Sequence, residues 1–273
     1  MAIRNDDRLQ KIFSGWIVDD RATNWLWLVL RDNGAEFDVE DFGTPGMRDR
    51  MAEYLDSRRR FICEIEDTQS RAFVPERDLQ WIEKFGRQPA WLLKKYLQGQ
   101  RNSVLSYFVG LTEKQKLVLL LDYLDETIFE KKRILDRLQM AWVQQQVDDR
   151  HFDWYDSGGK ENEKCKIAWQ WYQINHQWAA RHALEFVGKK DVLTFLDSTN
   201  FDLDAKLYHL GQIKRKFKAE QTKANRQGKT QTNLSLSEHA REQLDELAKR
   251  GGRTKTELIE LLIHNAYEHG VPN

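Results

Sequence analysis

The sequence predicts an α+β protein that is mostly α-helical, and three observations lead to this prediction. Alternating apolar patterns, which favour strands, are concentrated before residue 80. No proline lies between Pro89 and Pro272, so most of the chain is free to form helices. All ten tryptophans lie between Trp16 and Trp178, which marks the C-terminal part of the chain as a different kind of unit.

Length and composition restrict the class of protein. A chain of 273 residues is long enough for two domains of roughly 100–200 residues each. Its 43 Lys and Arg balance 43 Asp and Glu, so no overall charge attracts it to nucleic acid or to a membrane surface. No apolar run approaches the roughly 18 residues of a membrane-spanning helix, and we expect no membrane contact. Two cysteines, Cys63 and Cys165, exclude a disulfide framework and a four-cysteine zinc site, which indicates the cytoplasm.

Residues 1–80 are predicted to form a small β-rich domain. Asn33-Gly34 supplies the positive φ angles of a two-residue hairpin turn between two apolar runs. Residues 47–55 have the apolar spacing of a helix. Strands are expected over residues 12–18, 25–30, 37–39, 61–65 and 72–74. This β-β-β-α-β-β order matches an OB-like barrel, although several small α+β folds share it.

Residues 81–205 are predicted to form a helical bundle. Thr112-x-x-Gln115 is a capping-box pattern, and apolar residues then recur every three or four positions as far as Trp142. No Gly or Pro lies between 111 and 157, so we expect one long amphipathic helix there. Further helices are expected over residues 81–97, 164–186 and 190–196.

Residues 206–229 form a basic arm, in which eight Lys and Arg stand against the single acid Glu220. Such an excess within a neutral chain favours contact with phosphates. The residues expected to make these contacts are Lys214, Arg215, Lys216, Lys218, Lys223, Arg226 and Lys229.

Residues 230–273 begin with a short alternating strand over 230–236. These 44 residues are too few to bury a core alone, and a single strand would leave two unpaired edges. A two-fold dimer with paired antiparallel strands solves both problems. The resulting ribbon fits a DNA major groove, where its polar side chains, Gln231, Asn233 and Ser235, would contact base edges.

Two helices are expected after the strand. Ser237 is placed to cap the first, Gly251-Gly252 to end it, and Thr254-x-x-Glu257 to cap the second. The start of the second helix would hold a phosphate, through Arg253, Thr254, Lys255 and Thr256. The dimer core is expected to contain Leu234, Leu236, Leu244, Leu247, Leu258, Leu261 and Leu262.

The strand, both caps and the glycine turn resemble the ribbon-helix-helix family of DNA-binding dimers. This resemblance implies base contacts by Gln231, Asn233 and Ser235. It also implies phosphate contacts at the start of the second helix, by Thr254 and Thr256.

A longer stretch, about 160–270, resembles the MatP family of bacterial macrodomain-organising proteins. The resemblance rests on the Trp169-Gln170-Trp171-Tyr172 helix, the helices after it, the basic arm, and residues 230–273, which we call the C-terminal module. It implies that the bundle and the module grip a palindromic DNA site together. Some 160 residues precede this region, and no C-terminal coiled coil follows it, so the resemblance does not extend to bridging of two DNA sites through that coil.

Other groupings of polar residues do not form a catalytic or metal-binding pattern. His151-x-Asp153 with Asp156 lacks a second His or Cys at a useful spacing. Ser157-Gly158-Gly159-Lys160 lacks the first glycine and the hydroxyl residue of a phosphate-binding loop. Acidic residues on the predicted strands, where a metal-dependent nuclease would place them, fall by default on solvent faces. They are Asp38, Glu40, Glu64 and Glu66. We therefore expect no catalysis, no metal and no cofactor.

The sequence as a whole predicts a homodimer that binds specific double-stranded DNA, with a palindromic site, in the bacterial nucleoid. Chromosome organisation and transcriptional regulation both fit, and a repressor or antitoxin of a mobile element is an alternative. A second alternative is a nuclease or single-strand-binding protein that uses the C-terminal module for targeting. In that reading Trp16, Trp25 and Trp27 stack on bases, whereas the simpler reading places them in a core. The N-terminal domain would dock a protein partner, extend the DNA footprint or help dimerisation.

Overall fold

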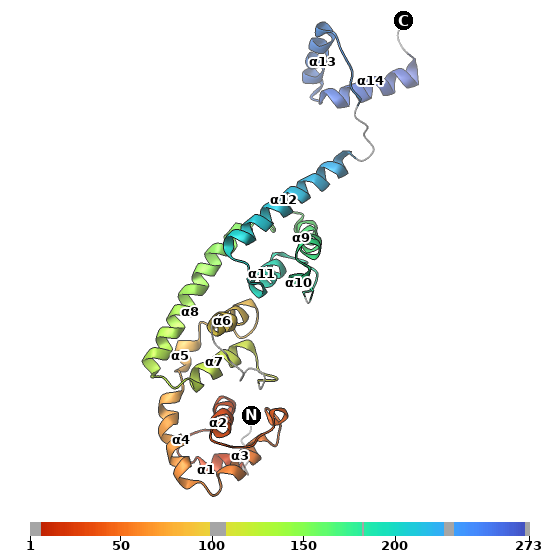
Figure 1. The fold of residues 1–273 in the computed structure, drawn as a ribbon. Helices are drawn as coiled ribbons and strands as arrows, with labels where there is room; N and C mark the ends of the chain where they lie inside the picture. Colours follow the sequence, from red (N-terminus) through yellow and green to blue (C-terminus); the bar gives the residue numbers. More distant parts are fainter. Residues whose placement is uncertain (1–6, 99–107, 182, 227–231, 271–273) are drawn as a thin grey trace. The chain divides into compact units, whose positions relative to one another are not determined.

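The computed structural model describes residues 7–98, 108–181, 183–226 and 232–270, and these fall into two compact units, Met1–Phe217 and Lys218–Asn273. Every regular element in the described residues is a helix (Figure 1). Unit 1 contains α1 (Arg8–Ile12), α2 (Asp20–Asp32), η1 (Val39–Asp41), α3 (Met47–Leu55), α4 (Arg59–Ala72), α5 (Glu76–Leu79), α6 (Arg87–Leu97), α7 (Glu113–Tyr123), α8 (Ile128–Asp149), η3 (Arg150–Phe152), α9 (Glu161–Asn175), α10 (Gln177–Ala180) and α11 (Lys189–Ser198). The long α12 (Leu203–Arg226) continues into unit 2, which contains α13 (Glu238–Gly251) and α14 (Lys255–His269).

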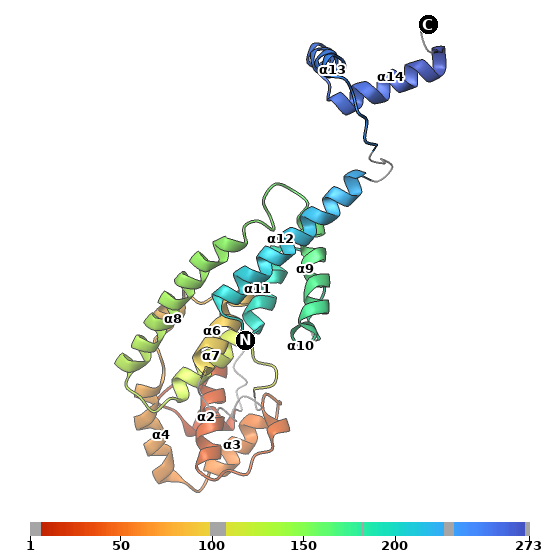
Figure 2. The same ribbon diagram turned by 45° about the horizontal axis from the view of Figure 1, so that its top comes forward.

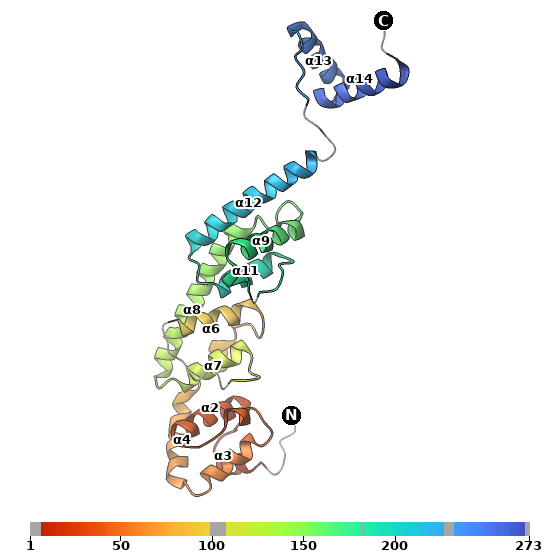
Figure 3. The same ribbon diagram turned by 45° about the vertical axis from the view of Figure 1, so that its right-hand side comes forward.

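The predicted β-rich domain with an OB-like barrel is wrong, because the N-terminal part of unit 1 is helical (Figure 3). Residues 25–30 lie inside α2, where nearly every side chain is buried. A run of six consecutive apolar residues is also the pattern of a buried strand, and it is too short to show the period of a helix by itself. Asn33-Gly34 ends this helix instead of turning a hairpin: Gly34 has a φ of +88°, and Ala35 donates its N–H to the carbonyl of Leu30 at 2.9 Å.

The other predicted strands are also absent from the described residues. Residues 61–65 lie in α4, where Phe61, Ile62 and Ile65 have a helical spacing that the sequence already contained. Residues 72–74 end α4 and lead to α5, and residues 12–18 form the end of α1 and a turn. The prediction of a helix over 47–55 is confirmed by α3.

The predicted long central helix is divided in two. The capping box of Thr112 and Gln115 is confirmed at the start of α7, but that helix ends at Tyr123. Thr127 then caps α8 by accepting the N–H of Glu130. No Gly or Pro marks this break, so the apolar spacing alone did not reveal it. The expected helix over 164–186 is likewise divided, into α9 and α10.

Two hydrophobic cores hold unit 1 together. The first extends from Leu9 to Trp142, and the second from Phe152 to Ile213. Trp25 and Trp27 are 2% and 1% exposed and therefore fill the first core, which excludes them as stacking surfaces for bases. In the first core the buried carboxylate of Asp122 accepts hydrogen bonds from Arg21 at 2.6 and 2.7 Å. Burial raises the pKa of this carboxyl group, and the guanidinium of Arg21 counteracts the rise.

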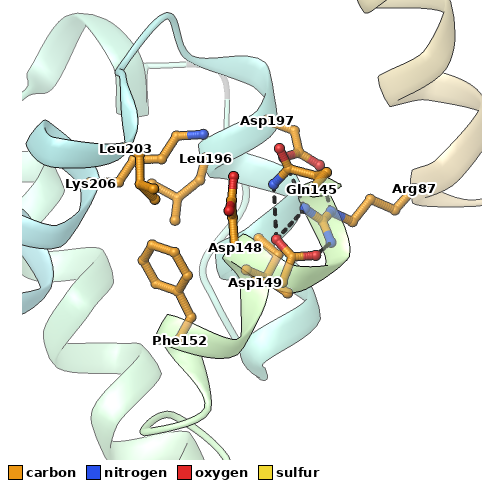
Figure 4. A pocket seen from close by; sticks show the side chains of 10 residues that line it. Arg87, Gln145, Asp148, Asp149, Phe152, Leu196, Asp197, Leu203 and Lys206 are labelled. Atoms are coloured by element: carbon orange, nitrogen blue, oxygen red, sulfur yellow. Dashed lines mark hydrogen bonds and ion pairs between the residues drawn. The ribbon is translucent and has the colours of Figure 1, made fainter. Parts of the chain in front are cut away.

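Arg87 links the two cores through ion pairs (Figure 4). It begins α6, on the side of the first core, and donates to Asp149 at 2.9 Å and to Asp197 at 3.0 Å. Its side chain is 12% exposed, and that of Asp197 is 9% exposed. Burial raises the pKa of Asp197, whereas its hydrogen bonds with Arg87 lower it again. Lys94 lies about two turns further along α6 and donates to the carbonyl of Thr199 at 2.8 Å.

Replacement of Arg87 by Ala should therefore destabilise unit 1, because it removes the guanidinium that pairs with two largely buried carboxylates. We expect a loss of about 3–5 kcal/mol in the free energy of unfolding, measured by chemical denaturation. Arg60→Ala is the matched control: its ion pair with Glu64 is exposed, and its loss should cost less than about 0.5 kcal/mol. Equal losses for the two variants would contradict a structural role for the Arg87 pairs.

The second core should make stability depend on pH through His209. This side chain is 5% exposed, and its ring lies 4.4 Å from that of His176. Burial, with a smaller contribution from His176, lowers the pKa of His209 from 6.5 to about 4. Below about pH 6.5 the unfolded chain therefore takes up a proton that the folded chain refuses until about pH 4.

Stability should accordingly be lost as the pH falls through this window. We expect a decrease of about 1–2 kcal/mol in the free energy of unfolding between pH 7 and pH 5. His209→Gln should reduce this pH dependence, whereas His151→Gln, at an exposed position, should leave it unchanged. Denaturation at both pH values measures the difference, and an unaltered pH dependence in His209→Gln would contradict the assignment.

Candidate nucleic-acid interface

The C-terminal module has the three helix signals that its sequence predicts. Ser237 caps α13 by accepting the N–H of Ala240 at 3.3 Å. Gly252, with a φ of +61°, ends α13, and the N–H of Arg253 bonds to the carbonyl of Ala248 at 3.1 Å. Thr254 and Glu257 form a reciprocal capping box at the start of α14, and α13 packs against α14.

The segment before α13 has no regular secondary structure over residues 232–236 in a single chain. The side chains of Asn233 and Ser235 are exposed there. Gln231 lies outside the described residues. A strand needs a partner strand for its backbone hydrogen bonds, and the described residues contain no strand. The base contacts of Gln231, Asn233 and Ser235 stay a prediction.

The apolar residues of the module are mostly uncovered in one chain. Among the described hydrophobic residues of unit 2, only Ala248 is buried. Leu234 is 59% exposed and Leu262 is 48% exposed. The remaining predicted core residues are exposed or half-buried, namely Leu236, Leu244, Leu247, Leu258, Leu261. Their burial requires a surface from outside the chain, so their role in a dimer stays a prediction that this exposure supports.

The basic arm begins packed in the second core, and its described side chains after Phe217 are mostly exposed. Ile213 is buried, and Phe217 makes an edge-to-face contact with Trp154 at 5.5 Å between ring centroids. Lys214 lies over the same Trp154 ring. Beyond Phe217, the side chains of Lys218 and Lys223 are exposed.

Several cations of the arm have no ion pair with any described residue, namely Arg215, Lys216, Lys218 and Lys223. Lys229 lies outside the residues that the structure describes, and so does the side chain of Arg226. Uncompensated cations on an exposed helix are available to phosphates.

The predicted phosphate site at the start of α14 is partly occupied by contacts within the module. The hydroxyl of Thr254 accepts the N–H of Glu257 at 3.3 Å, and Lys255 pairs with Asp245. This pairing lowers the pKa of Asp245. Arg253 and Thr256 are exposed. Residues 230–273 hold five Lys and Arg against seven Asp and Glu, so the module itself is slightly acidic.

The polar groupings outside the module have structural partners. Lys189 donates to Asp153 at 2.5 Å and to Asp156 at 3.0 Å. Lys164 fills the neighbouring loop, where its ammonium donates to the carbonyl of Trp154 at 2.9 Å. Glu64 pairs with Arg60 on the surface of α4. In the part of the chain that the structure describes, no three His, Cys, Asp or Glu side chains form a metal-binding group, and no helix is long and apolar enough to cross a membrane.

Comparison with known proteins addresses the C-terminal module. Residues 230–269 match the family described as "Ribbon-helix-helix protein, copG family". No curated protein and no solved structure matches the chain. The similarity of residues 160–270 to the MatP family stays a prediction. The match confirms the resemblance of the C-terminal module: this chain carries a ribbon-helix-helix module of the copG family, a type of module that binds DNA as a dimer.

Proposed function

We propose that this protein is a homodimer that binds a specific double-stranded DNA sequence, as a transcriptional regulator or a chromosome organiser. One observation carries the proposal: exposed cations of α12 that have no ion pair with a described residue come shortly before a ribbon-helix-helix module in the chain. The cations provide sequence-independent attraction to phosphates, and the module provides side chains for base recognition.

The ribbon would read the major groove. Paired strands from two chains present Gln231, Asn233 and Ser235 twice, related by a two-fold axis. Amide side chains hydrogen-bond to adenine edges, and hydroxyl groups bond to several bases. Because the protein surface is then two-fold symmetric, the preferred DNA site would be palindromic.

The arm would supply most of the attraction to DNA. The module has more acids than bases, so its own overall charge does not favour approach to a polyanion. Residues 206–229 carry eight Lys and Arg against one Glu, and they directly precede the module in the chain. Phosphate contacts by the arm therefore increase affinity for every sequence, while ribbon contacts decide among sequences.

Base and phosphate contacts should respond differently to mutation. With a duplex selected from a random library, Asn233→Ala should cost about 1–3 kcal/mol and relax the preference at one position of each half-site. Lys218→Ala should weaken binding to all duplexes alike and lower the slope of log K against log salt by about one. Fluorescence anisotropy at several salt concentrations measures both effects. A uniform loss for Asn233→Ala would contradict base recognition by the ribbon.

Dimerisation should be required for specific binding. Leu262→Glu places a carboxylate in the proposed dimer core, and we expect at least about a hundredfold loss of affinity for the selected duplex. Glu242→Gln, an exposed position of α13, is the control and should bind normally. Anisotropy titrations measure the affinities, and sedimentation shows the mass of each variant. Full specific binding by Leu262→Glu would exclude the proposed core.

The two biological roles are separated by the distribution of bound sites. Genome-wide mapping would find one or a few operators near promoters for a regulator, including one of a mobile element. It would find many palindromes in one chromosomal region for an organiser. Binding without any sequence preference would contradict both roles.

A further inference from the structure

Helix α8 has an apolar stripe on the side that faces away from the core. Leu135, Leu138 and Trp142 are buried in the first core. Four large apolar side chains lie on the opposite side of the same helix, because they are spaced by eleven, three and four residues. They are Phe129, Met140, Val143 and Val147, which are 69%, 73%, 55% and 44% exposed. Figure 2 shows α8 as one long helix at the edge of unit 1.

This stripe differs from the scattered exposed apolar residues of an ordinary surface. Its four side chains span about 27 Å on one side of a single helix, at 1.5 Å per residue, and the exposed Arg133 and Asp136 lie between Phe129 and Met140 on that side. An apolar stripe of this length on a solvent-facing helix is typical of a surface that another helix covers. No described residue of this chain covers these four side chains.

We propose that the first half of the stripe, from Phe129 to Met140, packs against the same half of α8 in a second copy of this chain, in antiparallel orientation. The charges within the stripe favour this occupant. Arg133 and Asp136 lie on the same side of α8 as Phe129 and Met140, and both are exposed. In a parallel pair, Arg133 would face Arg133 of the second copy and Asp136 would face Asp136, and like charges repel.

An antiparallel pair removes this repulsion. If the two-fold axis crosses α8 midway between residues 134 and 135, Arg133 faces Asp136 of the second copy. The same axis sets Phe129 opposite Met140, so one register matches the ionic contact and this apolar contact, whereas Val143 and Val147 extend past the start of α8 in the second copy. Asp136 has no partner among the described residues, and Arg133 pairs only with Glu130, at 3.0 Å in an exposed position. Both side chains are free to turn toward a second helix.

In the homodimer that we propose, on which this step rests, the C-terminal module already holds a second copy near the first. A contact between two single helices is small beside the roughly 1,200–2,000 Å² of a stable interface, so we expect it to be weak alone. Attachment to a dimerising module raises the local concentration of the second helix and strengthens a weak contact. The α8 contact and the C-terminal contact use different parts of the chain. The α8 contact can therefore form between the two chains of one dimer or between chains of two dimers.

Disulfide cross-linking of the full-length protein tests the antiparallel register. In a Cys63→Ser background, which removes the exposed native thiol, a chain with Phe129→Cys and Met140→Cys places two cysteines opposite those of the second copy. We expect this double variant to form a covalent dimer on mild oxidation, at least about ten times faster than either single variant. The control pair, Phe129→Cys with Gln144→Cys, should react as slowly as the single variants.

Charge exchange provides the second test. Arg133→Asp or Asp136→Arg alone, added to the cross-linking variant, should slow the reaction several-fold because like charges then face each other. Both changes together should restore the rate. Rapid cross-linking by Met140→Cys alone would indicate a parallel pair and overturn the proposal, as would equal rates for the double variant and the control pair. All substitutions are at exposed positions, so circular dichroism should show unchanged helix content.

Discussion

Burial of apolar surface is the constraint that governs the C-terminal module. Its two helices are well capped, but helices of 14 and 15 residues are marginal in water without a packed face. Among the described residues of the module, one chain buries a single apolar side chain, that of Ala248. In our proposal a second chain supplies the rest of the core and also the second strand of the ribbon. Folding of the module, dimerisation and assembly of the DNA-reading surface then occur together.

Unit 1 follows a different principle, in which apolar cores are joined by buried polar contacts. Arg87 connects the start of α6 to carboxylates at the end of α8 and in α11. Within the first core, Lys131 donates to the carbonyls of Ala72 and Asp122 at 2.7 and 3.0 Å. Buried charges of this kind add little net stability, but removal of one partner is costly. They therefore fix how the helices are arranged more than they increase the free energy of unfolding.

Structural features that depend on neighbouring residues could be predicted from the sequence, whereas contacts between distant residues could not. The caps at Ser237, Thr254 and Thr112 depend on neighbouring residues, and each is confirmed. The strand prediction over 25–30 failed because these six consecutive apolar residues show no helical period of their own, and the polar residues of α2 lie before and after them. The contact of Arg87 with Asp197 joins residues 110 positions apart, and nothing near either residue indicates it. The spacing of Phe129, Met140, Val143 and Val147 places them on one side of a helix. The sequence does not tell which side of that helix is buried, and the structure shows that this side is exposed.

The acidic composition of the module has a consequence for how such a protein would search a genome. A surface that is basic throughout adheres to any stretch of DNA and leaves it slowly. Here seven acids against five bases would make the helices of the module poor contacts for the DNA backbone, while in our proposal the arm ahead of them would keep the protein near it. Residence at a wrong sequence would be short, because only a matched ribbon adds contacts to those of the arm. Discrimination would then arise from rapid release elsewhere as much as from tight binding at the correct site.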